Sequence, residues 1–158
     1  MKTVLAPIDL SDAAADVTSK ACDLAGVLGA RLVLLHVVPP PAVINEYAAE
    51  SERLAQDEMN EANRRMGYWK QGLAGTSVDA DTVIQYGPPV EMILAEAART
   101  KADYIVMGTH GHGALYHLFL GGTVSAVIQK SRSPVMVVPT QKAGAHSSAV
   151  HGKAAKTS

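Results

Sequence analysis

The sequence has a single cysteine and few aromatic residues, with one phenylalanine, one tryptophan and five tyrosines among 158 residues. Because Cys22 is alone, no disulfide can form within the chain. A chain without disulfides is typical of a reducing compartment, so we expect a cytoplasmic protein. Cys22 lies in a helical apolar pattern with no histidine or basic neighbour, which favours a partly buried structural residue over a reactive thiol.

Long apolar runs and a strong excess of one charge are also missing. No run approaches the roughly 20 apolar residues of a membrane span, and Pro7 and Asp9 interrupt the N-terminal run too early for a signal peptide, so we expect no membrane partner. The formal net charge is −1, and removing the three lysines of residues 141–158 leaves −4. This weakly acidic balance argues against a nucleic-acid partner.

Residues 1–140 alternate between apolar runs and helical patterns, as expected of one domain, whereas residues 141–158 have no periodicity and are predicted to be a disordered tail. The predicted strands are residues 4–8, 31–38, 78–86, 104–108 and 135–138. Helical patterns follow at 12–28, behind the cap-like Ser11-Asp12, at 42–72, and in the apolar stripe from Val90 to Ala98. This order predicts an α/β fold, a doubly wound, Rossmann-like parallel sheet of five strands with helices on both faces.

The long second helical pattern is polar. Its helical spacing predicts that Glu61 pairs with Arg64 and Arg65 on a solvated face. Met66 and Trp69 are expected to pack this helix against the rest of the domain.

A doubly wound sheet binds ligands beyond the carboxyl ends of its strands. The first strand is followed by Ile8 and Asp9, the second ends at His36, Val37 and Val38, and the fourth opens into glycines at Gly108, Gly111 and Gly113. Glycines allow a backbone to approach an anion closely, and a helix start directs N–H groups at it. The sequence therefore predicts a site for a phosphate-bearing ligand.

Four segments together resemble the universal stress protein family: residues 4–9, 35–37, 102–111 and 133–138. The resemblance covers residues 1–140 and implies an adenine nucleotide alpha hydrolase-like fold. In the ATP-binding branch of that family, a glycine is followed by two residues, a second glycine, nine residues, a third glycine, and then serine or threonine. Gly108, Gly111 and Gly121 match this pattern, whereas Gly122 stands where the hydroxyl is usual.

The resemblance implies ATP, or ADP or AMP, as ligand, with Mg²⁺ on its phosphates. Asp9 would lie near the ribose and could position the Mg²⁺, and the backbone of Val37 would bind the adenine edge. The whole set of candidate nucleotide-binding residues is Pro7, Ile8, Asp9, Val37, Met107, Gly108, His110, Gly111, His112, Gly113, Gly121, Gly122, Thr123 and Val124. A neutral side-chain hydrogen bond contributes about 0.5 to 1.5 kcal/mol and one to a charged phosphate about twice that, so the missing hydroxyl at Gly122 weakens binding without abolishing it, and Thr123 offers an oxygen one residue later.

Several of these residues have alternative interpretations. Asp9 could form an Asx turn with Ser11 or help to cap the first helix, and His36 is expected to be satisfied locally at its strand end. The histidines of the loop, His110, His112 and His117, suggest zinc, but no acidic or cysteine side chain lies among them, and imidazoles facing phosphates are the simpler account.

Two functions are compatible with these motifs. The first is a stress-response regulatory module that binds an adenine nucleotide and acts on an unknown downstream protein, with at most slow ATP hydrolysis resting on Asp9 and Mg²⁺, since the sequence shows no catalytic constellation. The alternative is a nucleotide-independent dimeric interaction protein of the same fold. In both cases the apolar last strand, Val135, Met136, Val137 and Val138, is expected to pair with its copy in a homodimer.

Overall fold

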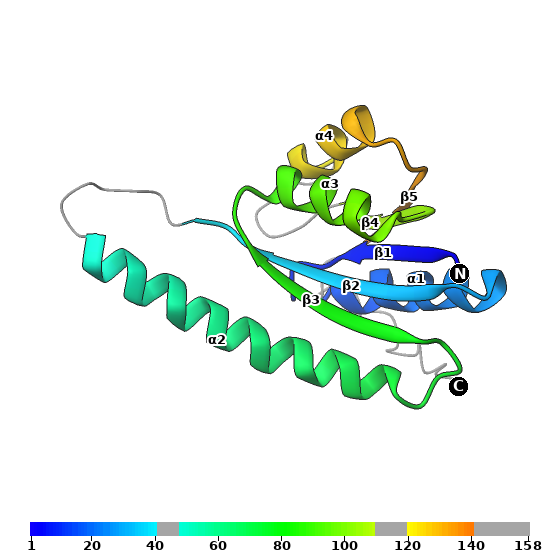
Figure 1. The fold of residues 1–158 in the computed structure, drawn as a ribbon, viewed down its shortest axis with the longest axis horizontal. Coiled ribbons are helices and arrows are strands. Elements are labelled where there is room, and N and C mark those ends of the chain that lie inside the picture. Colours follow the sequence, from blue (N-terminus) through cyan, green and yellow to red (C-terminus); the bar gives the residue numbers. More distant parts are fainter. Residues whose placement is uncertain (41–47, 110–119, 141–158) are drawn as a thin grey trace, which may run out of the picture.

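The computed structural model describes residues 1–40, 48–109 and 120–140. Strands and helices alternate along these residues (Figure 1). The strands are β1 (Thr3–Pro7), β2 (Arg31–Val38), β3 (Ala80–Tyr86), β4 (Tyr104–Gly108) and β5 (Val135–Val138). The helices are α1 (Ala14–Leu28), α2 (Ala48–Leu73), α3 (Pro89–Thr100) and α4 (Gly122–Lys130). The predicted tail, residues 141–158, lies outside the described residues.

All five strands run parallel in one sheet of order β3-β2-β1-β4-β5. The chain builds outward from β1 to β3, then returns to the other side of β1 with β4, so the strand order reverses between β1 and β4. This confirms the predicted doubly wound sheet of five strands. It also locates the switch point, where such folds bind ligands, at the carboxyl ends of β1 and β4.

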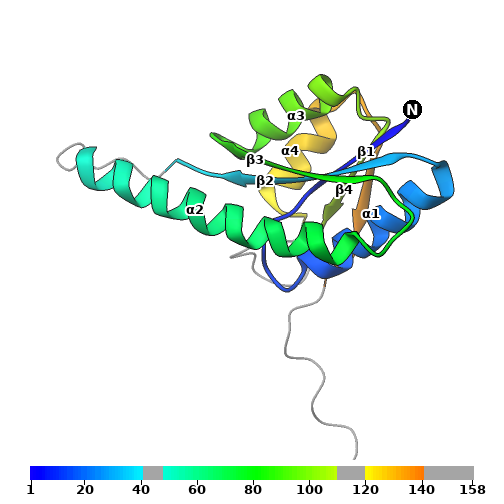
Figure 2. The ribbon, with the colours of Figure 1, turned by 60° about the horizontal axis from the view of Figure 1, so that its bottom comes forward.

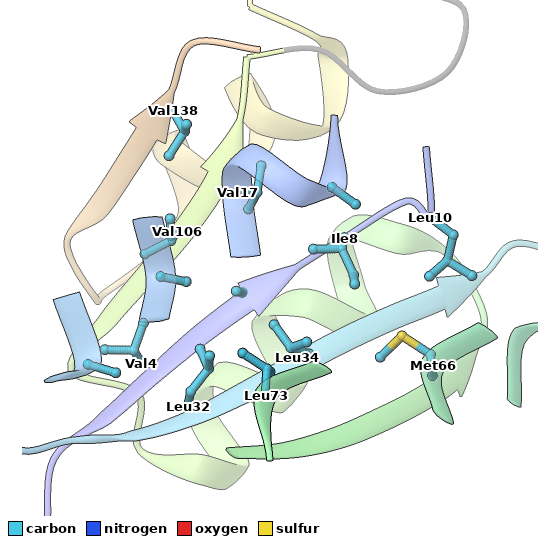
Figure 3. Close-up of a cluster of buried hydrophobic side chains, with 14 of the residues drawn as sticks. Val4, Ile8, Leu10, Val17, Leu32, Leu34, Met66, Leu73, Val106 and Val138 are labelled. Atoms are coloured by element: carbon cyan, nitrogen blue, oxygen red, sulfur yellow. The ribbon is translucent and has the colours of Figure 1, made fainter. Parts of the chain in front are cut away.

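Two apolar layers cover the sheet, one on each face (Figure 2). Buried side chains of α1 and α2, among them Val17 and Met66, pack on one face against Leu34 and Val106 (Figure 3). Side chains of α3 and α4 pack on the other face, against residues such as Leu35. Because both faces are covered, the inner strands are apolar on both sides, as their near-continuous Val, Ile and Leu runs predict.

The bounds of several elements differ from the prediction, and residues 42–47 of the predicted second helix lie outside the described residues. β1 lies one residue earlier than predicted, β3 begins two residues later, and α1 begins at Ala14 instead of residue 12. The predicted cap at Ser11-Asp12 is wrong: Ala13 occupies the N-cap position, and among the residues that the structure describes no side chain accepts a hydrogen bond from the helix start. The Ser11 hydroxyl donates to Asp9 instead, at 2.6 Å, so it is engaged in the loop before the helix.

The second half of α2 packs on the sheet, whereas residues from Glu50 to Glu58 are mostly exposed. Met66 is buried and Trp69 is partly buried against the same layer, which confirms their predicted packing role. The Glu61–Arg64 pair also forms, with the guanidinium donating to both carboxylate oxygens at 2.9 and 2.6 Å, and this hydrogen bond lowers the pKa of Glu61. None of the described helices is both long enough and apolar enough to cross a bilayer.

The predicted ion pair between Glu61 and Arg65 is replaced by a different contact. The Arg65 guanidinium donates a hydrogen bond to the backbone carbonyl oxygen of Leu10, in the loop between β1 and α1. Helical spacing alone favours the Glu61 carboxylate as the partner of Arg65. It cannot predict the Leu10 carbonyl oxygen, because only tertiary packing brings that atom next to the helix. Arg65 therefore connects α2 to a loop 55 positions earlier in the chain.

A buried carboxylate connects α3 to the edge strand β3. The Glu96 side chain is fully buried, accepts a hydrogen bond from the Gln85 amide at 2.7 Å, and also binds the Arg99 guanidinium, whose Nε lies at 2.9 Å. Because a buried charge is tolerated only with such partners, this cluster fixes how α3 lies on the sheet. The N-terminal end of α3 then reaches the carboxyl edge of the strands.

Candidate functional site

A cavity of about 560 Å³ lies at the carboxyl edge of the sheet. The ends of β1, β2 and β4 form part of its wall, and the first turns of α1, α3 and α4 form the rest. This is the edge at which the order of strands reverses, so the fold opens a cavity where a doubly wound sheet is expected to bind its ligand. A volume of this size is typical of small-molecule and cofactor sites.

The cavity gathers ten of the residues that the sequence singles out. They come from three strand ends and from the start of α4, and they are Pro7, Ile8, Asp9, Val37, Met107, Gly108, Gly121, Gly122, Thr123 and Val124. The other four candidates, His110, Gly111, His112 and Gly113, lie outside the described residues, as does His117 of the zinc hypothesis. In the described part of the chain, no group of three or more histidine, cysteine or acidic side chains could hold a metal ion.

Sequence reasoning missed the contribution of two helices to this cavity. Ala13, Ala14 and Val17 line it from α1 and the residue before it, and Pro89 and Ile93 line it from α3. The α1 residues are small or apolar and show no chemical signal. The α3 residues could have been predicted, because they follow the carboxyl end of β3, and ligands bind beyond the carboxyl ends of the strands in such a sheet. Leu35, His36 and Pro39 complete the wall beside Val37.

The start of α4 presents backbone donors to the cavity. Its first three residues, Gly122, Thr123 and Val124, line the cavity. The Ser125 N–H, on the next residue, donates a hydrogen bond to the Gly121 carbonyl oxygen at 3.0 Å. The N–H groups before that bond have no acceptor within the helix, and none of the side chains in the described part of the chain caps them. Together with the positive end of the helix dipole, they form a favourable environment for an anion.

The start of α4 lies close to the end of the fourth strand. The N–H of Gly121 donates to the carbonyl of Thr109, directly after β4, at 3.0 Å. A Cβ added at Gly122 would meet no atom of the described residues within 4 Å. The residues that the structure describes therefore leave room for a side chain at the position where the serine or threonine of the motif is missing.

Asp9 supplies the carboxylate of the cavity. Its Oδ1 accepts hydrogen bonds from the backbone N–H of Ser11 at 3.0 Å and from the Ser11 hydroxyl at 2.6 Å. The predicted Asx turn is thus confirmed. It does not exclude a ligand role, because an ionised carboxylate has two oxygens and about four acceptor sites.

His36 connects two of the strand ends beneath the cavity. Its Nδ1 donates to the carbonyl oxygen of Ile8 at 2.8 Å, since a carbonyl can only accept, and the Ile8 N–H donates to the Leu35 carbonyl at 2.8 Å. This confirms the expected local partner for the imidazole. The contact holds the ends of β1 and β2 in a fixed register where both border the cavity.

The remaining wall is apolar. Val37 and Pro39 at the end of β2 and Pro89 and Ile93 of α3 provide hydrocarbon surface, while Gly108 and the start of α4 provide backbone polar groups. The wall of the cavity therefore combines apolar side chains with a few backbone polar groups, which is the usual character of a small-molecule or cofactor site.

The chain matches the universal stress protein family over residues 1–139. A universal stress protein of Thermus aquaticus is 36% identical over 139 residues, covering 87% of this chain and 98% of that protein. UspA, a universal stress protein from Lactobacillus plantarum, has a solved structure with 29% identity and a TM-score of 0.80, covering 87% of this chain and 97% of the other. The structure of MJ0577, a universal stress protein of Methanocaldococcus jannaschii, has 28% identity and a TM-score of 0.79, covering 90% and 98%.

Two more distant structures share the fold and contain adenine nucleotides. One is a universal stress protein in complex with cAMP, 24% identical with a TM-score of 0.58, covering 89% of this chain and 98% of the other. The second is the universal stress protein from Archaeoglobus fulgidus in complex with dAMP, 19% identical with a TM-score of 0.65, covering 87% and 97%.

Proposed function

The chain belongs to the universal stress protein family, and from this premise we propose that it is a regulatory module that binds an adenine nucleotide, ATP or its relatives ADP and AMP. The observation that carries the proposal is the cavity at the switch point of the sheet. Three strand ends and the start of α4 converge on it, and its wall combines apolar side chains with backbone polar groups. Two proteins of the same fold are in complex with cAMP and dAMP, which supports adenine as the base.

The composition of the wall suggests how the nucleotide is oriented. The base would lie against the apolar residues around Val37, whose backbone would read the adenine edge. The phosphates would lie at Gly108, Gly121 and the first N–H groups of α4, where the helix dipole favours negative charge. Among residues outside the described part, the resemblance adds His110 and Gly111 to the phosphate end.

Asp9 would hold the Mg²⁺ that accompanies a nucleoside triphosphate. Hard cations prefer carboxylate and phosphate oxygens and keep several waters, so one protein carboxylate beside the phosphates is a sufficient donor set. The Asx turn with Ser11 keeps the Asp9 carboxylate in a fixed place at the cavity. When bound, Mg²⁺ would neutralise part of the phosphate charge.

The chemistry of the cavity favours holding a nucleotide over cleaving it. Within the described residues, its wall contains one carboxylate, Asp9, and one imidazole, His36, whose Nδ1 donates to Ile8. The wall therefore offers no nucleophile beside a base. We propose that occupancy by the nucleotide is the regulatory signal for an unknown downstream protein, with at most slow hydrolysis assisted by Asp9 and Mg²⁺.

The test of this function is whether the purified protein binds an adenine nucleotide. Protein purified without added nucleotide is denatured by heat, and the released small molecules are identified by mass spectrometry, while calorimetry measures binding of Mg-ATP to the emptied protein. Adenine nucleotide in the extract or heat of binding supports the proposal. If the extract contains no adenine nucleotide and millimolar Mg-ATP gives no heat of binding, the proposal is wrong. The alternative is then a nucleotide-independent dimer, which the glycine at position 122 favours.

Gly122→Ser tests the departure from the ATP-binding motif. The position has room for a Cβ among the described residues, and serine fits the first turn of a helix better than glycine. A hydroxyl that donates to a charged phosphate is worth about 1.5 to 3 kcal/mol, so we expect ATP to bind at least about ten times more tightly. Titration by calorimetry, with Gly122→Ala as the control that adds only the Cβ, measures the effect. Equal or weaker binding by the serine variant than by the alanine variant would show that the hydroxyl is not used.

We also propose that β5 forms a homodimer by pairing with its copy. β5 is an edge strand, and in the described part of the chain it pairs only with β4. Its sequence, Val135–Val138, is wholly apolar, and Met136 is 39% exposed. An unpaired apolar edge promotes aggregation, and antiparallel self-pairing covers it.

Met136→Lys should convert such a dimer into a monomer. A two-fold axis through paired edge strands places each lysine near its copy, and a lysine on an edge strand opposes pairing. Sedimentation velocity at micromolar concentration measures the oligomeric state. The control is Val27→Lys, the same kind of change at an 86% exposed position of α1, which should leave the dimer intact. A wild-type protein that sediments as a monomer contradicts the dimer.

A further inference from the structure

Leu10, the residue after Asp9, has an unusual backbone conformation. Its φ is 61°, in the left-handed region that side chains other than glycine and asparagine rarely adopt. Its side chain is nevertheless 6% exposed and belongs to the buried cluster that includes Ile8 and Met66 (Figure 3). A leucine in this conformation must be held there by its surroundings, because the turn itself disfavours it.

Part of that restraint comes from α2. The Arg65 guanidinium donates a hydrogen bond to the Leu10 carbonyl oxygen, while the next residue of the helix, Met66, is buried in the same cluster as the Leu10 side chain. One turn of α2 thus contacts both the backbone and the apolar layer of the loop. α2 otherwise packs mainly on β2 and β3, and this contact connects it to the loop that follows the neighbouring strand β1.

The same loop presents Asp9 to the cavity. Asp9 accepts hydrogen bonds from the backbone N–H and the hydroxyl of Ser11, on the far side of Leu10. The left-handed turn at Leu10 brings these two residues together, because reversing φ there would redirect the chain between them. The place of the Asp9 carboxylate therefore depends on the conformation of Leu10.

We propose that Arg65 is a positioning residue: its hydrogen bond to the Leu10 carbonyl holds the left-handed turn that presents Asp9 to the cavity, and so couples α2 to the nucleotide site. The coupling to the nucleotide site rests on the function proposed above, whereas the positioning of the loop by Arg65 does not. Coupling of this kind is reciprocal. A partner that binds the exposed first half of α2 and shifts the helix would change nucleotide affinity, and nucleotide binding would in turn restrain α2.

The test compares Arg65→Met, which keeps much of the side-chain stem but removes the donors, with Arg64→Met, the same change at the neighbouring exposed residue that pairs with Glu61. The first measurement is hydrogen exchange of the Ser11 amide in the protein without nucleotide. Loss of a hydrogen bond from a charged donor should accelerate this exchange about tenfold in Arg65→Met, and leave it unchanged in Arg64→Met. Arg65→Lys, which keeps a charged donor, should restore part of the protection.

The second measurement is the ratio of the ATP affinities found with Mg²⁺ and with EDTA. If Arg65 acts through Asp9, this ratio falls severalfold in Arg65→Met, whereas general loosening of the fold would lower both affinities and leave the ratio unchanged. Equal Ser11 exchange in the two methionine variants overturns the proposal whatever the nucleotide result. A wild-type protein that does not bind ATP overturns the proposed function instead, and the Ser11 exchange still decides whether Arg65 positions the loop.

Discussion

Ala13→Trp is expected to weaken adenine nucleotide binding by at least about 100-fold, the largest functional effect that follows from the structure. Ala13 is half-buried, lines the cavity, and stands at the N-cap of α1, where its backbone is already in the helical region. An indole at this position occupies space within a cavity of about 560 Å³ without replacing any core side chain. The nucleotide would have to displace the indole to bind.

The matched control is Ala15→Trp, the same substitution two residues later at an exposed position of α1. Both variants lose an alanine from the start of the same helix, so their thermal unfolding should be similar, and only Ala13→Trp should lose binding in a calorimetric titration with Mg-ATP. Equal affinity of the two variants would mean that the nucleotide does not use this cavity.

Leu34→Ala is expected to lower the free energy of unfolding by about 3 to 4 kcal/mol. Leu34 lies in β2, is fully buried, and belongs to the layer that α1 and α2 form with the sheet. Truncation removes its transfer free energy and leaves a cavity that the rigid strands on either side cannot close. This loss is a large part of the stability of an ordinary domain.

Urea denaturation measures this effect, and a lower midpoint with an unchanged slope identifies it as a change in stability. Leu54→Ala is the matched control, because Leu54 is 55% exposed on the first half of α2. It should change the free energy of unfolding by no more than about 0.5 kcal/mol. Similar losses in the two variants would contradict the assignment of the core.

The sequence predicts the elements and the strand ends of this fold well, for a physical reason. Strands covered on both faces are apolar on both faces, so β2 and β4 are visible as runs and their bounds are predicted correctly. The rule that ligands lie at carboxyl strand ends then selects Asp9, Val37 and Gly108, which the fold does bring to one cavity. The prediction of these residues depends on the local apolar pattern and on the order of strands and helices, and both can be inferred from the sequence.

The remaining features depend on tertiary placement. Ala13 lines the cavity at the N-cap of α1, a position that the cap-like Ser11-Asp12 does not predict. Arg65 donates to Leu10 because packing of α2 brings the carbonyl of a left-handed turn within its reach, an acceptor that helical spacing does not reveal. Neither the position of Ala13 at the cavity nor the hydrogen bond from Arg65 to Leu10 can be predicted from the sequence pattern.

The most direct measurement is a crystal structure of the protein grown with Mg-ATP. We predict adenine against Val37, phosphate oxygens within hydrogen-bond distance of the N–H groups at the start of α4, and the Asp9 carboxylate beside the metal. A cavity that contains no nucleotide at millimolar Mg-ATP, or a nucleotide bound away from the ends of β1 and β4, would contradict it.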